Sequence, residues 1–301
     1  MHPLIAALIQ NGPVVTDGSW GTQMHKRGLK RGQCPDSWNL SHPEQVEDVA
    51  RQYVDAGSQI ILTNTFGASR LSLSNYKLGD KVVEINSAGV RISKQAAGDR
   101  VRVFASIGPT GRMLVTGETT EEELRKVFEE QADAQAQAGA DGIIIETMID
   151  IDEARIAAQA AKRTGLPVIV SMVFDSGEDK DRTMMGNSPE EFAAEIQKIG
   201  VDGLGANCGQ GIEAFLPICR RLRQATDLPL WMKPNAGLPE VVDDCVVFRT
   251  TPAEFVKYVP DLIRAGANFI GGCCGTDQNF VKAIGAAART SSNSGNQLPG
   301  A

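Results

Sequence analysis

Three of the six cysteines stand where a sequence pattern can bring them together. Cys208 follows a short apolar run in GLGANCGQG, and Cys273 and Cys274 follow another in FIGGCCGT. Thiolates prefer Zn²⁺ or Cu(I) to Mg²⁺ or Ca²⁺, and three protein ligands with one open position are typical of a reactive zinc site. The sequence therefore predicts that Cys208, Cys273 and Cys274 hold zinc, provided that the fold brings them to one place.

The other three cysteines have simpler interpretations. Cys219 lies in the helical pattern FLPICRRL, whereas Cys34 and Cys245 lie in loops. Cysteine is often a small apolar residue of the interior, so we assign none of these to the metal.

Two carboxylates, like the three thiols, lie at or just after the ends of short apolar runs. Asp17 follows the run PVVT, and Glu146 ends the run GIIIE. A carboxylate at the end of a buried strand needs a specific cationic partner, although a salt bridge or a helix cap would also satisfy it. The three histidines all lie within the first 42 residues and none ends a strand, so we assign none to catalysis.

An alternation of short apolar runs and longer amphipathic segments must position these residues. We expect strands at residues 14–16, 59–64, 101–107, 142–146, 168–173, 203–207, 230–233 and 268–272, and helices at 43–56, 80–97, 120–138, 151–163, 212–226, 252–265 and 277–289, with another beginning at Ser188. Eight such units predict an α/β protein with one (β/α)8 TIM barrel over residues 1–290; a doubly wound open sheet is the alternative. We expect residues 175–187 to form a surface excursion near the active face and residues 291–301 to be a disordered tail.

Barrel geometry then gathers the reactive residues. Active sites of such barrels lie at the C-terminal ends of the strands, where all three cysteines and both carboxylates fall. Ring closure makes the last and first strands neighbours, so Asp17 should lie close to the thiols.

Composition excludes several classes of protein. Hydrophobic residues make up 42% of the chain and charged residues 22%, which is ordinary for a folded domain. With 30 basic and 37 acidic residues the net charge is −7, so the chain lacks the basic footprint of a nucleic-acid-binding protein. No apolar run is long enough to span a membrane and no signal peptide is evident, so we expect a cytoplasmic protein with reduced thiols.

Seven motifs occur in order along the chain: DGSWGT (17–22), NTFGASR (64–70), SIGPTG (106–111), ET (146–147), GANCGQG (205–211), KPNAG (233–237) and GGCCGT (271–276). In this combination the chain resembles the homocysteine S-methyltransferase family, and within it the homocysteine-binding domain of cobalamin-dependent methionine synthase. The resemblance implies a zinc-dependent barrel that methylates the thiol of L-homocysteine to give L-methionine.

The resemblance also implies roles for individual residues. Cys208, Cys273 and Cys274 would hold zinc. Asp17 and Glu146 would bind the ammonium group of homocysteine. The backbone amides of Gly18 and Ser19 would bind its carboxylate. Asn235 would lie close to the metal and contact the substrate.

The methyl donor is open between two classes. Gly67 stands where betaine-using relatives carry an aromatic residue, which favours methylcobalamin or another methylcorrinoid; the chain shows no cobalamin-binding module, so we expect a separate corrinoid protein. Direct transfer from betaine, S-methylmethionine or another small onium donor is the alternative. Trp20 departs from the smaller residue usual in this motif, and we expect it to reshape the donor entrance.

Two further interpretations belong to other classes of protein. The zinc could be structural in a non-catalytic barrel that binds an amino acid. A metal-free barrel could form a Schiff base at Lys233, but that interpretation leaves the adjacent cysteines unexplained.

Overall fold

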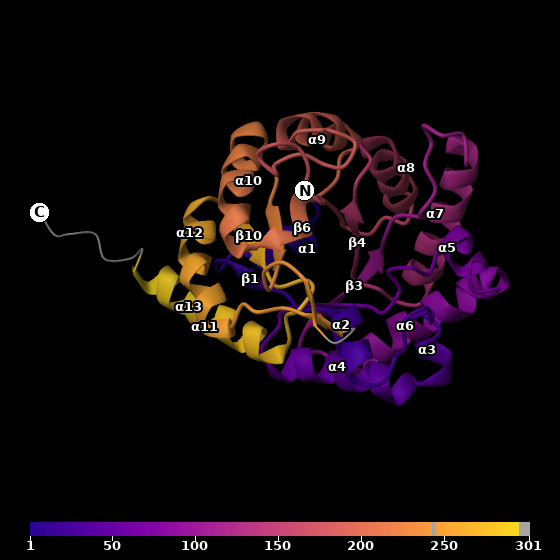
Figure 1. Cartoon of the computed structure of the whole chain (residues 1–301), viewed down its shortest axis with the longest axis horizontal. Helices are drawn as coiled ribbons and strands as arrows, with labels where there is room; N and C mark the ends of the chain where they lie inside the picture. The colour runs from indigo at the N-terminus through magenta and orange to yellow at the C-terminus, as the bar shows by residue number, and fades with distance from the viewer. Residues whose placement is uncertain (243–244, 295–301) are drawn as a thin grey trace, which may run out of the picture.

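A computed structural model describes residues 1–242 and 245–294, and within these ranges eight parallel strands form the centre of the molecule (Figure 1). Neighbouring strands are hydrogen-bonded in the order β1-β10-β7-β6-β5-β4-β3-β2. Their bounds are β1 Val14–Val15, β2 Ile60–Leu62, β3 Arg102–Ile107, β4 Gly142–Met148, β5 Val168–Met172, β6 Gly203–Gly211, β7 Leu230–Asn235 and β10 Ala267–Ile270. The expected (β/α)8 TIM barrel is confirmed.

Side chains help to close the ring between β1 and β2. The backbone N–H of Gln59 donates to the Val15 carbonyl at 2.7 Å, and the Gln59 side chain accepts from the Val15 N–H at 2.9 Å. Three residues after Gln59, at the end of β2, the Leu62 N–H donates to Asp17 Oδ2 at 2.7 Å. Asp17 therefore takes part in the closure of the barrel.

Helices surround the strands on the outside of the ring (Figure 1). Several begin at side-chain caps: Thr120 caps α7, and Ser188 and Thr251 form capping boxes with Glu191 and Glu254 at α9 and α11. The helices are α1 Pro3–Ile9, α2 Trp20–Lys26, α3 Trp38–Ser41, α4 Pro43–Asp55, α5 Arg70–Ser74, α6 Val82–Ala97, α7 Glu121–Gln137, α8 Ile151–Lys162, α9 Pro189–Ile196, α10 Ile212–Ala225, α11 Pro252–Phe255, α12 Val259–Arg264 and α13 Gln278–Ser294, with short 3₁₀ turns at Gly79–Lys81, Gln197–Ile199 and Val256–Tyr258.

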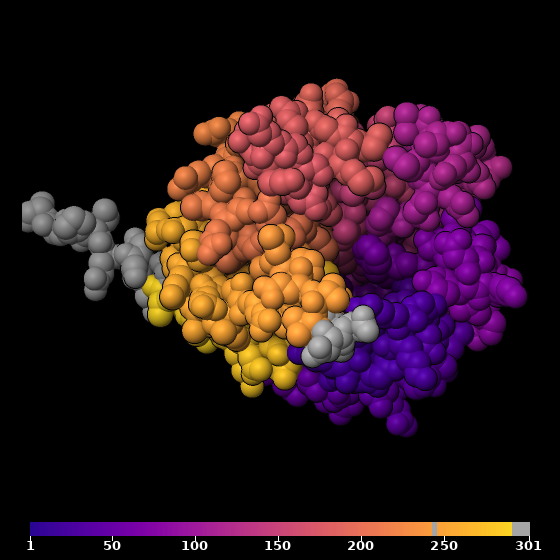
Figure 2. All heavy atoms as spheres, viewed as in Figure 1, coloured from indigo at the N-terminus to yellow at the C-terminus, as the bar shows by residue number. Residues whose placement is uncertain are grey.

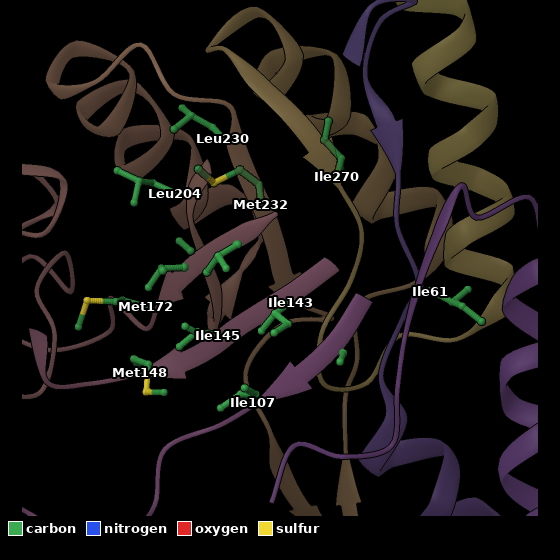
Figure 3. Close-up of a cluster of buried hydrophobic side chains, with 14 of the residues drawn as sticks. Ile61, Ile107, Ile143, Ile145, Met148, Met172, Leu204, Leu230, Met232 and Ile270 are labelled. Carbon is green, nitrogen blue, oxygen red and sulfur yellow. The ribbon is translucent and has the colours of Figure 1, made fainter. Parts of the chain in front are cut away.

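Alternate residues of the strands build two apolar layers. Inward-facing side chains fill the barrel interior, and Ile5 of α1 packs against them; these strand residues are Val14, Ile60, Leu62, Phe104, Ile144, Ile169, Trp231 and Phe269. Outward-facing residues such as Ile143, Ile145 and Met172 pack beneath the helices (Figure 3). Both faces of the strands are thus buried, as a parallel barrel requires.

The strand bounds differ from the expected ones mainly at the carboxyl ends. β6 continues through Cys208 to Gly211, and β4 continues to Met148, each with a local shift of register. β7 reaches Asn235, whereas β10 ends at Ile270, before the glycine pair. The irregular ends are where the polar side chains gather, so hydrophobic patterning alone could not locate them.

Two excursions lie on the face to which the strand ends point. Residues 175–187 follow β5 and carry an isolated bridge between Ser176 and Arg182. A hairpin that sequence patterning missed, β8 Glu240–Val242 and β9 Cys245–Val247, follows β7.

The end of the chain is only partly described. The last helix extends beyond the expected residue 289 to Ser294; residues 295–301 of the expected tail lie outside the described residues. None of the helices in the described ranges is long and apolar enough to cross a membrane.

Candidate active site

Three thiols converge at the carboxyl ends of β6 and β10. Cys208 lies within β6, and Cys273 and Cys274 follow β10 after two glycines. Their sulfur atoms all lie within 4.8 Å of one another, and the Sγ atoms of Cys208 and Cys273 are 2.8 Å apart. Sulfurs bound tetrahedrally to one zinc ion at about 2.3 Å lie roughly 3.8 Å apart, so sulfur movements of about 1 Å would adapt the cluster to zinc.

The electrostatics of the cluster favour a bound cation. Hydrogen bonding to Cys273 and Cys274, together with burial, raises the pKa of Cys208 well above the ordinary thiol value. The pKa of Cys274 is lowered to about 4, because the other two sulfurs hydrogen-bond to its thiolate. Without a cation one sulfur ionises at the expense of its neighbours, whereas a divalent metal lets all three bind as thiolates.

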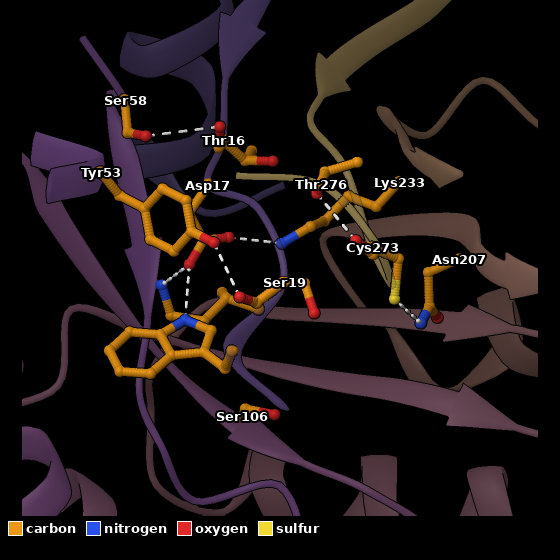
Figure 4. A network of polar contacts seen from close by, with 12 residues as sticks. Thr16, Asp17, Ser19, Tyr53, Ser58, Ser106, Asn207, Lys233, Cys273 and Thr276 are labelled. Carbon is orange, nitrogen blue, oxygen red and sulfur yellow. Dashed lines mark hydrogen bonds and ion pairs between the residues drawn. The ribbon is translucent and has the colours of Figure 1, made fainter. Parts of the chain in front are cut away.

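Asn207 connects the cluster to β4. Its Nδ2 donates to Thr147 Oγ1 at 2.7 Å and lies 3.5 Å from the Cys208 sulfur. The same nitrogen lies 3.9 Å from the Cys273 sulfur (Figure 4). Its Oδ1 accepts from the Thr147 N–H at 2.8 Å and from the Ser171 hydroxyl at 2.7 Å. Asn207 is fully buried, so its amide orients the thiols from beneath.

Asn235 connects the end of β6, which carries Cys208, with the segment after β10, which carries Cys273 and Cys274. Its Nδ2 donates to the Gly209 carbonyl at 2.7 Å, and its Oδ1 accepts from the Cys274 N–H at 3.0 Å. These bonds hold the backbone on either side of the cluster. They support a positioning role, and the expected contact between Asn235 and the substrate stays a prediction.

Asp17 is buried behind the wall of the same site, where it bonds two residues that line the cavity, Lys233 and Trp20 (Figure 4). Lys233 Nζ donates to Asp17 Oδ1, and the indole Nε1 of Trp20 donates to Asp17 Oδ2 at 2.8 Å. Asp17 and Lys233 are 0% and 2% exposed, so this ion pair is buried. Asp17 lies close to the thiol-bearing loop as expected: its carbonyl accepts from the Gly272 N–H at 3.0 Å.

Glu146 presents a second buried carboxylate. Its Oε1 accepts from the Ser106 hydroxyl at 2.6 Å, and its other oxygen has no protein donor in the described residues. Burial raises the pKa of Glu146 to about 7, although the nearby Lys233 ammonium opposes this shift. Glu146 can therefore exchange its proton for a cationic ligand near neutral pH.

Gly18 and Ser19 present free backbone donors just before α2. Neither N–H has an acceptor among the described residues, whereas the Ser19 side chain caps the helix through the Thr22 N–H at 3.2 Å. A Cβ atom at Gly18 would lie 2.9 Å from the Tyr53 ring and 3.0 Å from Thr276 Oγ1, so only glycine fits here. Two N–H groups before a helix are suited to an anion.

Most of these groups line one cavity of about 600 Å³, which opens on the face where the strands end, whereas Asp17, Asn207 and Asn235 are not among its lining residues. Its inner part contains the three cysteines, Glu146, Lys233, Gly18 and Ser19. Its outer part is lined by Trp20, Asp36, Phe66, Gly67 and Tyr76. Figure 2 shows a hollow on this face, between the atoms that follow β7 and the N-terminal part of the chain.

Two of the remaining cysteines are placed away from the thiol cluster. Cys219 is fully buried in α10, and burial raises its pKa to about 12. Burial raises the pKa of Cys34 to about 11, and its thiol lies 3.8 Å from Asp36 Oδ2. Neither takes part in the cluster. The side chain of Cys245 lies outside the described residues.

The family model for homocysteine S-methyltransferases matches residues 14–288. The chain belongs to the homocysteine S-methyltransferase family. The expected family is thereby confirmed over nearly the whole described barrel.

Relatives are similar to the chain in sequence, and a solved structure is similar to it in fold. The methionine synthases of Mycobacterium leprae and Mycobacterium tuberculosis are 27% and 28% identical to the chain over an aligned length of 295 residues, and each match covers 91% of this chain. The chain spans about a quarter of their length (24%). The fold resembles the metallated form of the Escherichia coli homocysteine methyltransferase MmuM, with a TM-score of 0.79 and 22% identity over 95% of this chain and 99% of that one.

Sequence reasoning missed three residues that shape this family site. Asn207 was visible only as the residue before Cys208, and its contact with Thr147 depends on where β4 ends. Lys233 was considered only as a nucleophile, although it forms an ion pair with Asp17. The hydroxyl of Ser106, on β3, could not be assigned to Glu146 before the register of β3 and β4 was known.

Proposed function

We propose that this chain transfers a methyl group to the sulfur of L-homocysteine, giving L-methionine, with zinc held by Cys208, Cys273 and Cys274. Membership of the family supports the reaction class. The observation that carries the proposal is the convergence of three thiols and a free carboxylate oxygen of Glu146 in one cavity. A soft metal site beside an ammonium site matches the two ends of homocysteine.

Zinc suits the donor set, because three thiolates bind it strongly and leave one position open. When bound, zinc would supply a Lewis acid that favours the thiolate form of the substrate sulfur near neutral pH. A free thiol has a pKa of about 8.5 and is mostly protonated at pH 7, whereas the thiolate is the nucleophile. In this chain Asn207 donates toward two of the sulfurs and keeps them oriented.

The amino-acid end of the substrate would be oriented by other groups that line the same cavity. Glu146 has one free oxygen for the ammonium group, and the N–H groups of Gly18 and Ser19 are free for the carboxylate. Asp17 already accepts three hydrogen bonds, and a carboxylate has about four acceptor positions. We therefore propose Glu146 as the main ammonium contact and Asp17 as a supporting one.

For the methyl donor we propose a methylcorrinoid carried by a separate protein. The chain is similar to a part of two methionine synthases, and in both of them most of the length lies outside the matched region. The outer part of the cavity is open and carries the exposed side chains of Phe66 and Tyr76, which suits a large donor.

A small onium donor is the second candidate, and the lining of the outer cavity favours it. Trp20, Phe66 and Tyr76 place aromatic rings around this part, and Asp36 adds a buried carboxylate. Aromatic faces and a carboxylate attract quaternary ammonium and sulfonium groups.

Two observations weigh against the other interpretations. A structural zinc site normally has four protein ligands, and three cluster in the described part of the chain. A Schiff base needs a neutral amine, yet attraction by Asp17 and Glu146 outweighs burial and raises the pKa of Lys233.

A panel of methyl donors tests the proposal. The zinc-loaded protein and homocysteine would be incubated separately with methylcobalamin, betaine and S-methylmethionine, and methionine would be measured by mass spectrometry. Formation of methionine from methylcobalamin, but not by the Cys208→Ala variant, is the expected result. Methionine formed only from an onium compound would replace the corrinoid donor. Loss of zinc without any change in homocysteine binding would contradict the proposed site.

A further inference from the structure

Lys233 places a buried cation in the wall of the cavity. It projects from β7, and its side chain is 2% exposed. One N–H of its ammonium group donates to Asp17 Oδ1, and the other two have no acceptor among the described residues (Figure 4). A buried ammonium with unused donors is costly, so a ligand that accepts them is favoured strongly.

The Lys233 ammonium has an aromatic neighbour and anionic neighbours besides its two unused N–H groups. Its Nζ lies 5.7 Å from the centre of the Trp231 ring on one side and contacts Asp17 on another. The free N–H groups of Gly18 and Ser19 belong to the two residues that directly follow Asp17 in the chain. Lys233, Gly18 and Ser19 all line the same cavity.

Charges in the inner cavity lead to the same conclusion. Lys233 balances Asp17, and Glu146 remains as a carboxylate that can pair with one external cation. A bound ammonium would use Glu146 and would be repelled by Lys233. The carboxylate of the same zwitterion would then be drawn to the Lys233 side of the cavity.

We propose that Lys233 is a substrate-binding residue that pairs with the α-carboxylate of the amino-acid substrate, together with the backbone amides of Gly18 and Ser19. This proposal rests on the proposed function, because it requires a thiol amino acid in the cavity. It makes Lys233 the residue that distinguishes an amino-acid thiol from a simple aminothiol.

A comparison of two thiols tests this role in the zinc-loaded protein. L-Homocysteine and 3-aminopropane-1-thiol differ only in the carboxylate, and their dissociation constants would be measured by calorimetry for wild type and Lys233→Met. Loss of a charged hydrogen bond corresponds to an increase in the dissociation constant on the order of 10- to 100-fold. We expect this increase for homocysteine relative to the aminothiol. The ratio of the two affinities is the readout, because the variant also leaves Asp17 without its partner.

The matched variant Lys233→Arg keeps the charge and should keep most of the preference for homocysteine. Equal changes for both thiols in Lys233→Met would show that Lys233 only anchors Asp17 and would overturn the proposal. If neither thiol binds wild type, the proposed function itself fails. Binding of both thiols with an unchanged ratio in the variant removes only the role of Lys233.

A measurement on wild type covers the case in which Lys233→Met does not fold. In protein labelled with ¹⁵N-lysine, the Nζ resonance of Lys233 would be assigned by its absence from Lys233→Arg. Homocysteine should shift this resonance, and 3-aminopropane-1-thiol should leave it nearly unchanged. The same shift with both thiols would contradict a contact with the carboxylate.

Discussion

Asn207 and Thr147 exchange two hydrogen bonds across the ends of β6 and β4. The Asn207 amide donates to Thr147 Oγ1 at 2.7 Å and accepts from the Thr147 N–H at 2.8 Å. Thr147 has a φ of +64° and Cys208 a φ of +61°, which costs each residue on the order of 1 kcal/mol or more. The paired hydrogen bonds offset this strain and aim Cys208 at Cys273.

Replacing Asn207 by alanine should therefore weaken zinc binding more than it weakens the fold. Loss of a residue that hydrogen-bonds to metal ligands, without itself binding the metal, typically lowers metal affinity by about 10- to 100-fold. A chelator competition measures the affinity for zinc. Ser171→Ala is the control, because Ser171 bonds Asn207 Oδ1 without facing the thiols. Equal zinc affinity in Asn207→Ala and wild type would refute the positioning role.

Glu146→Gln should weaken homocysteine binding and leave zinc binding nearly intact. A buried ammonium that loses its carboxylate partner costs about 2–5 kcal/mol. Calorimetry with homocysteine and with 4-mercaptobutyrate, which lacks the ammonium group, measures the difference. Only the homocysteine affinity should fall. A joint loss of stability and zinc, without preference between the two thiols, would reduce Glu146 to a structural anchor.

The raised pKa of Glu146 also predicts the pH dependence of stability. Between pH 4.5, the ordinary pKa of a glutamic acid side chain, and about pH 7, the folded state holds a proton that the unfolded state releases. The free energy of unfolding contributed by this group is therefore largest below pH 4.5, falls as pH rises through this window and is constant above it. Urea unfolding would be measured at pH 5 and pH 8. Between these two values the free energy of unfolding should fall more in wild type than in Glu146→Gln, by on the order of 1–3 kcal/mol. Asp36, whose pKa burial raises to about 6, contributes equally to both proteins. Parallel pH profiles for the two proteins would contradict the burial of an uncompensated Glu146 carboxyl.

Gly205 sets the distance between β6 and β7. A Cβ atom there would lie 2.0 Å from the Trp231 carbonyl oxygen, which belongs to the neighbouring strand. Gly205→Ala should force the strands apart, lower the free energy of unfolding by at least about 2 kcal/mol and displace Cys208. Thermal unfolding and zinc content measure both effects. Gly21→Ala is the control, because a Cβ at this helical glycine meets nothing within 4 Å; it should leave stability unchanged or raise it by up to about 1 kcal/mol. If Gly205→Ala keeps wild-type stability and zinc content, the close approach of β6 to β7 at this position is refuted.

The ring of strands could be predicted from the sequence, because runs such as GIIIE are apolar on both faces and helices follow them at regular intervals. The thiol cluster could be predicted for the same reason: strand ends of a barrel share one rim. These expectations depend only on periodicity and on the closure of the ring.

The side-chain partners within the site could not be predicted in this way. The pairing of Lys233 with Asp17 depends on which side of β7 faces the interior and on the closure between β1 and β10. The hydrogen bond from Ser106 to Glu146 depends on the register of β3 and β4, and the approach of Asn207 to Thr147 depends on two irregular strand ends. Periodicity carries no information on register shifts, so these contacts require the structure.

The cysteine variants test the metal ligands. Cys208→Ala, Cys273→Ala and Cys274→Ala should each lose zinc, because two remaining thiolates bind it much more weakly. Cys219→Ala should keep about one zinc per chain, since Cys219 is buried in α10 away from the cluster. Metal analysis of the purified proteins measures this. Full zinc content in any of the first three variants would remove that residue from the ligand set.

Zinc X-ray absorption tests most directly the claim that the substrate sulfur binds at the three-cysteine site. For the protein alone we predict three sulfur neighbours at about 2.3 Å and one lighter neighbour. With homocysteine the lighter neighbour should be replaced by a fourth sulfur, and the Glu146→Gln variant should need more homocysteine to reach the same spectrum. A spectrum with four sulfurs before homocysteine is added, or one that homocysteine does not change, would contradict the account.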